Sequence, residues 1–225
     1  MTIRRMLPAL LLRTSLFGDQ PADVVAAIAA VMQEVRYAAG TQIFARGDAG
    51  NALFLVKEGR VRLSILVPDG RELSFTHAVA GDVFGEIAVL DGSPRSANAT
   101  ALTEVVVFCL HRHDFNRLVD RHGSFARAVI RLLCARLREV SDHLEDIALL
   151  PLSARLARFF LNRAGGSVRV SLGMSQNELA LLLGASRPKV NAALMTLVQS
   201  GAIARDGEAF TCDARILADL AQRLE

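Results

Sequence analysis

The chain has 225 residues, of which 52% are hydrophobic, and its formal net charge is +3. This length suits one large domain or two small ones, with ample apolar material for buried cores. We predict no transmembrane helix and no membrane partner, because no apolar run reaches the roughly 18 residues that a span needs. Residues 151–225 hold nine basic and six acidic residues, whereas residues 1–150 hold 17 of each. The positive excess falls in the last third, where a nucleic-acid-binding domain would need it.

The first residues imitate a secretion signal only faintly. Arg4 and Arg5 precede the apolar stretch 6–12, but Arg13 ends it and no small-residue cleavage site follows. We therefore expect an N-terminal helix or arm that packs on the domain. The cysteines are widely spaced in apolar surroundings, which is typical of reduced thiols and predicts a cytoplasmic protein; they are Cys109, Cys134 and Cys212.

Residues 35–110 are predicted to form an antiparallel β-roll. Short β-prone runs alternate with glycines over this range, and residues 52–65 indicate two strands around Gly59. Pro68-Asp69-Gly70 is a further turn signal. Residues 21–34 have a helical periodicity instead, and we expect this helix to cap the roll.

The stretch from Gly81 to Thr100 combines a glycine-rich turn with a carboxylate and a later Arg-Ser pair. Gly85 permits backbone conformations that a Cβ would forbid. Glu86 can accept hydrogen bonds from sugar hydroxyls, Arg95 offers a charged fork that fits a phosphate, and Ser96 adds a hydroxyl beside it. These residues indicate a sugar phosphate site. The alternative is a solvated hairpin loop with incidental charges.

Residues 85–97, which we call the cassette, also resemble a known motif. Gly85-Glu86-Ile87 followed by Arg95-Ser96-Ala97 is similar to the phosphate-binding cassette of cyclic-nucleotide-binding domains. The chain resembles bacterial transcription factors of the cyclic-AMP receptor protein and FNR superfamily. The resemblance implies that Glu86 holds the ribose 2′-hydroxyl and that Arg95 and Ser96 hold the cyclic phosphate. Thr76, on a strand leading to the cassette, is a weaker candidate for a base contact.

Metal chemistry is not expected. His111 and His113 could suggest a cupin metal pair, but no carboxylate follows at the cupin spacing and the pair lies where strand should change to helix. Some FNR-like relatives hold an iron–sulfur cluster on N-terminal cysteines, and this chain has no cysteine before Cys109. We expect no metal, no haem and no iron–sulfur cluster.

From about Phe115 to Leu150 the pattern is helical. Six apolar residues recur at the alternating intervals of three and four that mark a coiled-coil seam, namely Ile130, Leu133, Leu137, Val140, Leu144 and Ile147. We call these six residues the seam. An ordinary core-packed amphipathic helix shows the same spacing over short distances. A long helix between two domains favours a homodimer interface, and the family resemblance implies the same.

Pro151 should end this helix, because it has no N–H to donate and its ring clashes with the preceding turn. The sequence therefore suggests three parts: a cyclic-nucleotide-binding β-roll with N-terminal helices at 1–114, a central dimerisation helix at 115–150 and a DNA-binding domain at 151–225. Beyond Pro151 we expect a helix at 153–163 and a short strand at 168–172.

The last part contains a helix-turn-helix pattern. Ser175 and Glu178 form a capping box that starts one helix, and Gly184 lies in the turn that ends it. Ser186 is expected to cap the second helix, which Gly201 stops. Two short strands around residues 206–207 would make a wing. A helical hairpin used only for packing is the alternative.

The second helix of such a motif enters the major groove, where its N-terminal residues reach the bases. Arg187, Lys189 and Asn191 are predicted as its exposed polar side chains, and Arg187 is the first candidate to pair with a guanine. Phosphate contacts are expected from Ser175, Gln176 and Ser186. The cyclic-AMP receptor protein has a glutamate and an arginine where this chain has Pro188 and Ala192, so its operator should not transfer unchanged.

The resemblance also implies base contacts from the central helix. The family's threonine and following serine match Val140 and Ser141, and its arginine one turn earlier matches Arg136. Val140 lacks the hydroxyl of the threonine, so cyclic AMP, cyclic GMP or both are candidate effectors.

The predicted fold class is α+β: an antiparallel jelly-roll-like domain, a long central helix and a winged helix-turn-helix. We expect a non-enzymatic transcription regulator that forms a homodimer, binds a palindromic double-stranded DNA operator when a cyclic nucleotide is bound, and contacts RNA polymerase. Two alternatives remain: a regulator of the same family with no nucleotide or another effector, and a cyclic-nucleotide-binding signalling subunit without DNA function.

Overall fold

The computed structural model describes residues 3–14, 16–66, 72–207 and 209–222. The chain forms two compact units. The first holds the residues up to Leu137 except Leu73–Phe75, and the second holds Leu73–Phe75 and the residues from Arg138 onward. The predicted turn at Pro68-Asp69-Gly70 lies outside the described residues.

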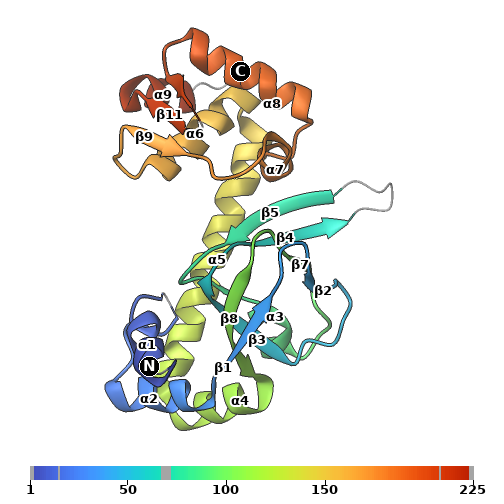
Figure 1. Ribbon diagram of the computed structural model, residues 1–225, viewed down its shortest axis with the longest axis vertical. Coiled ribbons are helices and arrows are strands. Elements are labelled where there is room, and N and C mark those ends of the chain that lie inside the picture. Colours follow the sequence, from blue (N-terminus) through green and yellow to red (C-terminus); the bar gives the residue numbers. More distant parts are fainter. Residues whose placement is uncertain (1–2, 15, 67–71, 208, 223–225) are drawn as a thin grey trace. The chain divides into compact units, whose positions relative to one another are not determined.

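Strands dominate the first unit. They are β1 (Gln33–Tyr37), β2 (Gln42–Phe44), β3 (Ala52–Glu58), β4 (Val61–Leu66), β5 (Glu72–Ala78), β6 (Val83–Phe84), β7 (Asn98–Ala101) and β8 (Val105–His111). They form two four-stranded sheets, of order β1-β8-β3-β6 and β2-β7-β4-β5 (Figure 1). The pairs β1–β8, β3–β8, β3–β6, β2–β7 and β4–β7 are antiparallel. The predicted antiparallel roll is confirmed.

The central strands of the first sheet are buried on both faces, which explains their continuous apolar sequences. In β3, Leu53 and Leu55 belong to the core between this sheet and the helices. Phe54 and Val56 alternate with them and belong to the core between the two sheets. Because successive side chains of a strand point to opposite faces, one short strand contributes to both cores.

Helices cover the outer face of this sheet. The helices whose bounds include residues of the first unit are α1 (Ile3–Leu11), α2 (Ala22–Val31), α3 (Glu86–Asp91), α4 (Arg112–Arg121) and α5 (Gly123–Leu149). As predicted, the N-terminal residues form a helix that packs on the domain, with Leu7 and Leu11 in the core. Among the described residues, no helix has the length and apolar character needed to cross a bilayer.

The predicted helix at 21–34 is too long by its last turn. The helix ends at Val31, and Gln33–Tyr37 pairs instead with β8. The hydrogen bonds and side-chain packing that β1 gains in the sheet outweigh the helical periodicity of this segment.

The predicted continuous helix from about Phe115 to Leu150 is divided at His122, whose backbone is extended. The break allows Phe115 of α4 to meet Phe125 of α5, with ring centroids 5.4 Å apart. In a straight helix, residues this far apart in sequence would point in different directions. Core packing therefore explains the break.

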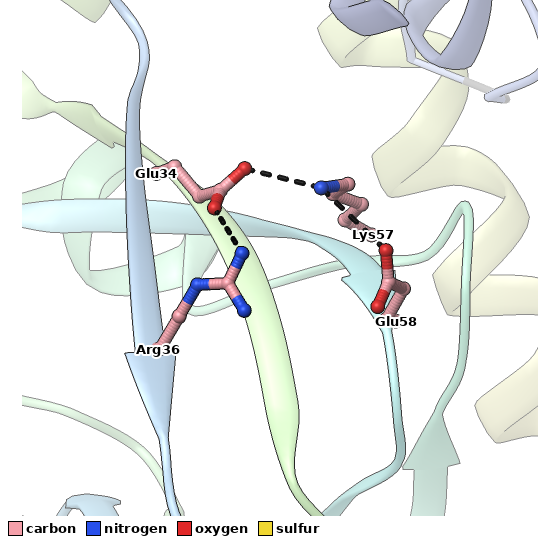
Figure 2. Close-up of polar contacts among 4 residues, drawn as sticks. All are labelled: Glu34, Arg36, Lys57 and Glu58. Atoms are coloured by element: carbon pink, nitrogen blue, oxygen red, sulfur yellow. Dashed lines mark hydrogen bonds and ion pairs between the residues drawn. The ribbon is translucent and has the colours of Figure 1, made fainter. Parts of the chain in front are cut away.

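A network of charges lies across β8 on the first sheet, and Figure 2 shows its four residues. Lys57 of β3 contacts Glu34 of β1 at 3.1 Å and Glu58 at 3.5 Å, and Arg36 contacts Glu34 at 2.8 Å. The hydrogen bonds from Lys57 and Arg36 lower the pKa of Glu34. This network links the two strands that flank β8.

The elements of the second unit after α5 are α6 (Leu152–Ala164), β9 (Arg169–Ser171), α7 (Gln176–Leu182), α8 (Arg187–Gln199), β10 (Ile203–Asp206), β11 (Ala209–Cys212) and α9 (Ala214–Ala221). The strands form an antiparallel sheet of order β10-β11-β9. Both predicted helices of the helix-turn-helix and the predicted wing strands are present. Helix α9 was not predicted, although Asp213 caps it by accepting hydrogen bonds from two backbone N–H groups.

The starts of the two helix-turn-helix helices differ. Ser175 and Glu178 form the predicted capping box, in which each side chain accepts a hydrogen bond from the backbone N–H of the other. Ser186 is the N-cap residue of α8, as predicted, but its side chain makes no capping hydrogen bond. Pro188 lies in the first turn of α8, where its missing N–H costs little.

Candidate functional site: an anion-binding cassette and a DNA-reading helix

Arg95 is the central residue of the cassette. Its side chain is buried, with 5% of the residue exposed. Nη1 donates to the carbonyl oxygen of Gly85 at 2.7 Å, and Nη2 donates to that of Ala52 at 2.7 Å. The first residue of β3 and the residue before α3 thus accept hydrogen bonds from the same guanidinium.

An aromatic ring supports the guanidinium from one side. The Cζ atom of Arg95 lies 4.2 Å from the ring centroid of Phe44, a cation–π distance. Phe44 in turn packs with Phe54 and Phe84, with ring centroids 6.0 Å away in each case. Phe44 is a residue of the site that the sequence did not reveal, because only the pairing of β2 with β7 brings it beside Arg95.

Part of the hydrogen-bonding capacity of Arg95 is unused. Its Nε atom is buried and has no hydrogen-bond partner among the described residues. Burial lowers the pKa of Arg95 below its ordinary value, but an arginine remains protonated in proteins. A guanidinium is a planar cation whose N–H groups can pair with a phosphate.

Glu86 lies next to this cation at the start of α3. Gly85 precedes it with a φ of 75°, in the left-handed region that favours glycine. A Cβ at Gly85 would also lie 2.7 Å from Nη1 of Arg95. Burial raises the pKa of Glu86, and the positive charges of Arg136 and Arg95 partly oppose that shift. The site therefore pairs a buried cation with a buried carboxyl group that can accept hydrogen bonds.

Other predicted ligand residues have different surroundings. Arg136 lies near the cassette and donates from Nη2 to the carbonyl oxygen of Val83 at 3.2 Å. Ala97 is buried, and Thr76 of β5 is half-buried. The exposed members of the predicted set are Ile87, Ser96, Val140 and Ser141. Val140 and Ser141 belong to the second unit, where they are exposed residues of α5.

The predicted DNA-contacting residues lie at the first turns of α7 and α8. Ser175 and Ser186 occupy the capping positions and are exposed, and Gln176 is half-buried. Arg187 and Lys189 are exposed in the first turn of α8. Polar side chains thus occupy the starts of both helices.

Asn191 differs from the prediction. We expected an exposed side chain, but the residue is half-buried, and its Oδ1 atom is buried without a hydrogen-bond partner among the described residues. The next turn of α8 packs its apolar side into the core of the second unit, which includes Val190 and Leu194. Asn191 lies at the edge of that packed side, which explains its partial burial.

Two family models match the chain. Residues 34–122 match the cyclic nucleotide-binding domain, which includes the whole cassette. Residues 154–220 match the Crp-like helix-turn-helix domain, which includes α7 and α8.

Relatives resemble the chain over nearly its whole length. A CRP-like cAMP-activated global transcriptional regulator from Mycobacterium tuberculosis is 31% identical, and the match covers 88% of this chain and 92% of the relative. The cyclic AMP receptor protein of Thermus thermophilus is 32% identical over 83% of this chain and 86% of its own. The crystal structure of Thermus thermophilus catabolite activator protein has a TM-score of 0.56 and 29% identity, covering 92% of this chain and 98% of that chain.

Members of this family are DNA-binding transcription regulators and not enzymes, and they typically act as dimers. Both family models match in the order that such regulators require, with the cyclic nucleotide-binding domain before the helix-turn-helix. The chain therefore belongs to the CRP/FNR family of transcription regulators.

Proposed function

We propose that a cyclic nucleotide, cyclic AMP or cyclic GMP, bound at the cassette controls DNA binding by this regulator. The observation that carries the proposal is the buried guanidinium of Arg95, which has an unused Nε–H and lies beside the buried Glu86. The cyclic phosphate would pair with Arg95 and Ser96, and the ribose 2′-hydroxyl would donate to Glu86. Gly85, Ile87 and Ala97 would complete the cassette.

Cyclic AMP is the first nucleotide to test, because the names of the two relatives from Mycobacterium tuberculosis and Thermus thermophilus refer to it. Base selectivity would come from Thr76, Arg136, Val140 and Ser141. Since Val140 has no hydroxyl, we expect weaker discrimination between adenine and guanine than a threonine would provide.

Calorimetric titration of the full chain tests this proposal. Cyclic AMP and cyclic GMP are titrated separately, with adenosine as the control that lacks a phosphate. We expect at least one cyclic nucleotide to bind and adenosine to bind far more weakly. If neither cyclic nucleotide binds at millimolar concentration, the nucleotide assignment is wrong and another effector, or none, controls the protein.

We further propose that α5 forms a homodimer through the seam. All six seam residues are exposed in the single chain, including Leu137 at 68% and Val140 at 65%. In contrast, Phe125, Ala128 and Leu132 of the same helix are buried. An exposed apolar stripe at this spacing is what a two-stranded coiled-coil interface requires.

Substitution within the seam tests the dimer. Leu137→Asp places a charge at the interface, so we expect the protein to sediment as a monomer at micromolar concentration. Leu149→Asp is the matched control, because Leu149 is an exposed leucine of the same helix outside the seam. A dimer that survives Leu137→Asp would move the interface elsewhere on the chain.

For DNA, we propose that α8 is the reading helix and that each dimer binds a palindromic operator. Arg187, Lys189 and Asn191 would contact bases, and Ser175, Gln176 and Ser186 would contact phosphates. The two reading helices of the dimer should then lie about 34 Å apart. The nucleotide would favour the dimer conformation with this spacing, which raises DNA affinity by a population shift.

We propose one role for each part of the chain: residues 1–114 bind the nucleotide, residues 115–150 form the dimer and residues 151–225 bind DNA. We also propose that the DNA-bound regulator contacts RNA polymerase. Titration repeated in the presence of operator DNA should give a tighter nucleotide affinity, since coupling between two sites is reciprocal.

A further inference from the structure

We propose that Arg112 is a positioning residue of the cassette, which acts by holding the backbone segments that orient Arg95 and Glu86. The ligand assignment in this inference rests on the proposed cyclic nucleotide function.

The side chain of Arg112 joins two segments that are far apart in sequence. Nη2 donates to the carbonyl oxygen of Gly50 at 2.6 Å and also to that of Ala88. The backbone N–H of Arg112 donates to the carbonyl oxygen of Asn51 at 2.8 Å. One residue at the start of α4 therefore holds both the loop before β3 and the helix α3.

Both segments carry groups that form the site. Ala88 lies in α3, whose first residue is Glu86. Gly50 and Asn51 lead directly to Ala52, whose carbonyl oxygen accepts a hydrogen bond from Arg95. A shift of either segment would therefore change the distance between the carboxyl group and the guanidinium.

The two segments also pack without spare room. A Cβ at Gly50 would lie 2.2 Å from Cβ of Ala88 and 3.4 Å from Cδ of Arg95. Such close packing holds only while α3 stays against the loop, and the two hydrogen bonds from Arg112 span the same junction. Arg112 is thus well placed to keep the junction closed.

The position of Arg112 in its own helix supports this role. A cation in the first turn of a helix is unfavourable, because the free N–H groups there carry partial positive charge. Arg112 is the first residue of α4. The residue is half-buried, and its guanidinium donates to two backbone carbonyl oxygens, which compensate for that cost. A second cation near Arg95 also increases the attraction of the site for an anion.

The first test requires no nucleotide. Phenylglyoxal modifies accessible arginines, and mass spectrometry measures the modification rate at each position. Arg95 should be protected in the parent protein and modified several-fold faster in Arg112→Met. Arg112→Lys should fall between them, because a lysine can donate to one or both carbonyl oxygens but lacks the planar fork. Arg121→Met, an exposed position on the same helix, should leave Arg95 protected.

The second test asks whether Arg112 acts through Arg95. We expect Arg112→Met to weaken cyclic AMP binding about tenfold, a coupling typical of neighbouring residues. In an Arg95→Lys background the same substitution should weaken binding much less, since the group that it positions has already been altered. A merely structural role would give the same loss in both backgrounds.

The outcomes separate this inference from the proposed function. If the parent protein binds neither cyclic nucleotide, the effector assignment fails while the protection of Arg95 still decides the role of Arg112. If Arg95 stays protected in a folded Arg112→Met, or if the losses in the two backgrounds are equal, Arg112 is not a positioning residue.

Discussion

The cassette and the reading helix α8 hold their functional side chains in opposite ways. In the cassette, Arg95 is buried, bonded to two carbonyl oxygens and stacked on Phe44. On α8, Arg187 and Lys189 are exposed and have no hydrogen-bond or ion-pair partner among the described residues. The fold orients the first set, whereas a DNA duplex would have to orient the second.

This difference suits the two proposed ligands. A small anion must replace its whole hydration shell with protein groups, so the receptor needs fixed donors before the ligand arrives. DNA offers a long surface with many phosphates, so side chains of the reading helix can order themselves on contact. We therefore expect substitutions in the cassette to affect both folding and binding, and substitutions on α8 to affect binding alone.

The largest effect should come from Arg95→Ala. Removing one partner of a buried, hydrogen-bonded charge pair costs about 2–5 kcal/mol, which corresponds to a loss of about 30-fold to several thousand-fold in cyclic nucleotide affinity. Calorimetric titration measures this loss. Thermal unfolding should also shift downward, because the carbonyl groups of Gly85 and Ala52 lose their donors.

Arg46→Ala is the control for charge alone, since Arg46 is an exposed arginine in the loop before β3. It should change affinity only slightly. Sedimentation should show that Arg95→Ala is still a dimer, because Arg95 is not part of the seam. Unchanged nucleotide affinity in Arg95→Ala would refute the phosphate role of this residue.

Several features of the cassette and of the helix-turn-helix could be predicted from the sequence, because the signals for them are local. The turn, carboxylate and arginine of the cassette lie within one short segment. The capping box at Ser175 and the turn at Gly184 also depend on neighbouring residues, and the structure has both. Local signals of this kind need no knowledge of which strands pair.

The remaining features depend on contacts between distant segments. Phe44 contacts Arg95 only because β2 pairs with β7. Arg112 contacts Ala88 only because α4, which follows β8, lies beside α3. The break at His122 likewise depends on core packing, and no local sequence signal predicted it. Helix α9 is the exception, because the capping residue Asp213 could have predicted it from sequence.

An intermediate effect is expected for Arg187→Ala. A bidentate arginine–guanine contact contributes about 1–3 kcal/mol of discrimination against the wrong base. Binding to a duplex selected from random sequence by the parent protein should weaken accordingly, with relaxed preference at one base pair in each half-site. Thermal unfolding should not change, because the side chain is exposed and unpartnered within the described chain.

Arg215→Ala provides the matched control, since Arg215 is an exposed arginine of the same unit on α9. It should lower affinity for selected and unselected duplexes to the same small extent. If Arg187→Ala behaves like this control, Arg187 does not read a base. If Arg187→Ala lowers the unfolding temperature, the contrast between a preordered cassette and a free reading helix is wrong for α8.

The smallest expected effect is the pH dependence of stability, which should differ in sign between two carboxyl groups of the roll. Burial raises the pKa of Glu86 above its ordinary value of 4.5, so without nucleotide its contribution to stability is fully present below that value and is lost as the pH rises through the raised pKa. Glu34 has the opposite sign. Its pKa is lowered by Lys57 and Arg36, so its contribution is present above 4.5 and is lost as the pH falls through the lowered pKa.

Nucleotide binding should follow Glu86 and not Glu34. A ribose hydroxyl donates best to the ionised carboxylate. Because the pKa of Glu86 is raised, the residue keeps its proton to a higher pH, and nucleotide binding favours the loss of that proton. Affinity for cyclic AMP should therefore decrease by at most about tenfold per pH unit as the pH falls through that pKa. Calorimetry in buffers of different ionisation enthalpy measures the released proton. Glu86→Gln should abolish the release and Glu34→Gln should preserve it, whereas release that persists in Glu86→Gln would assign the proton to another group.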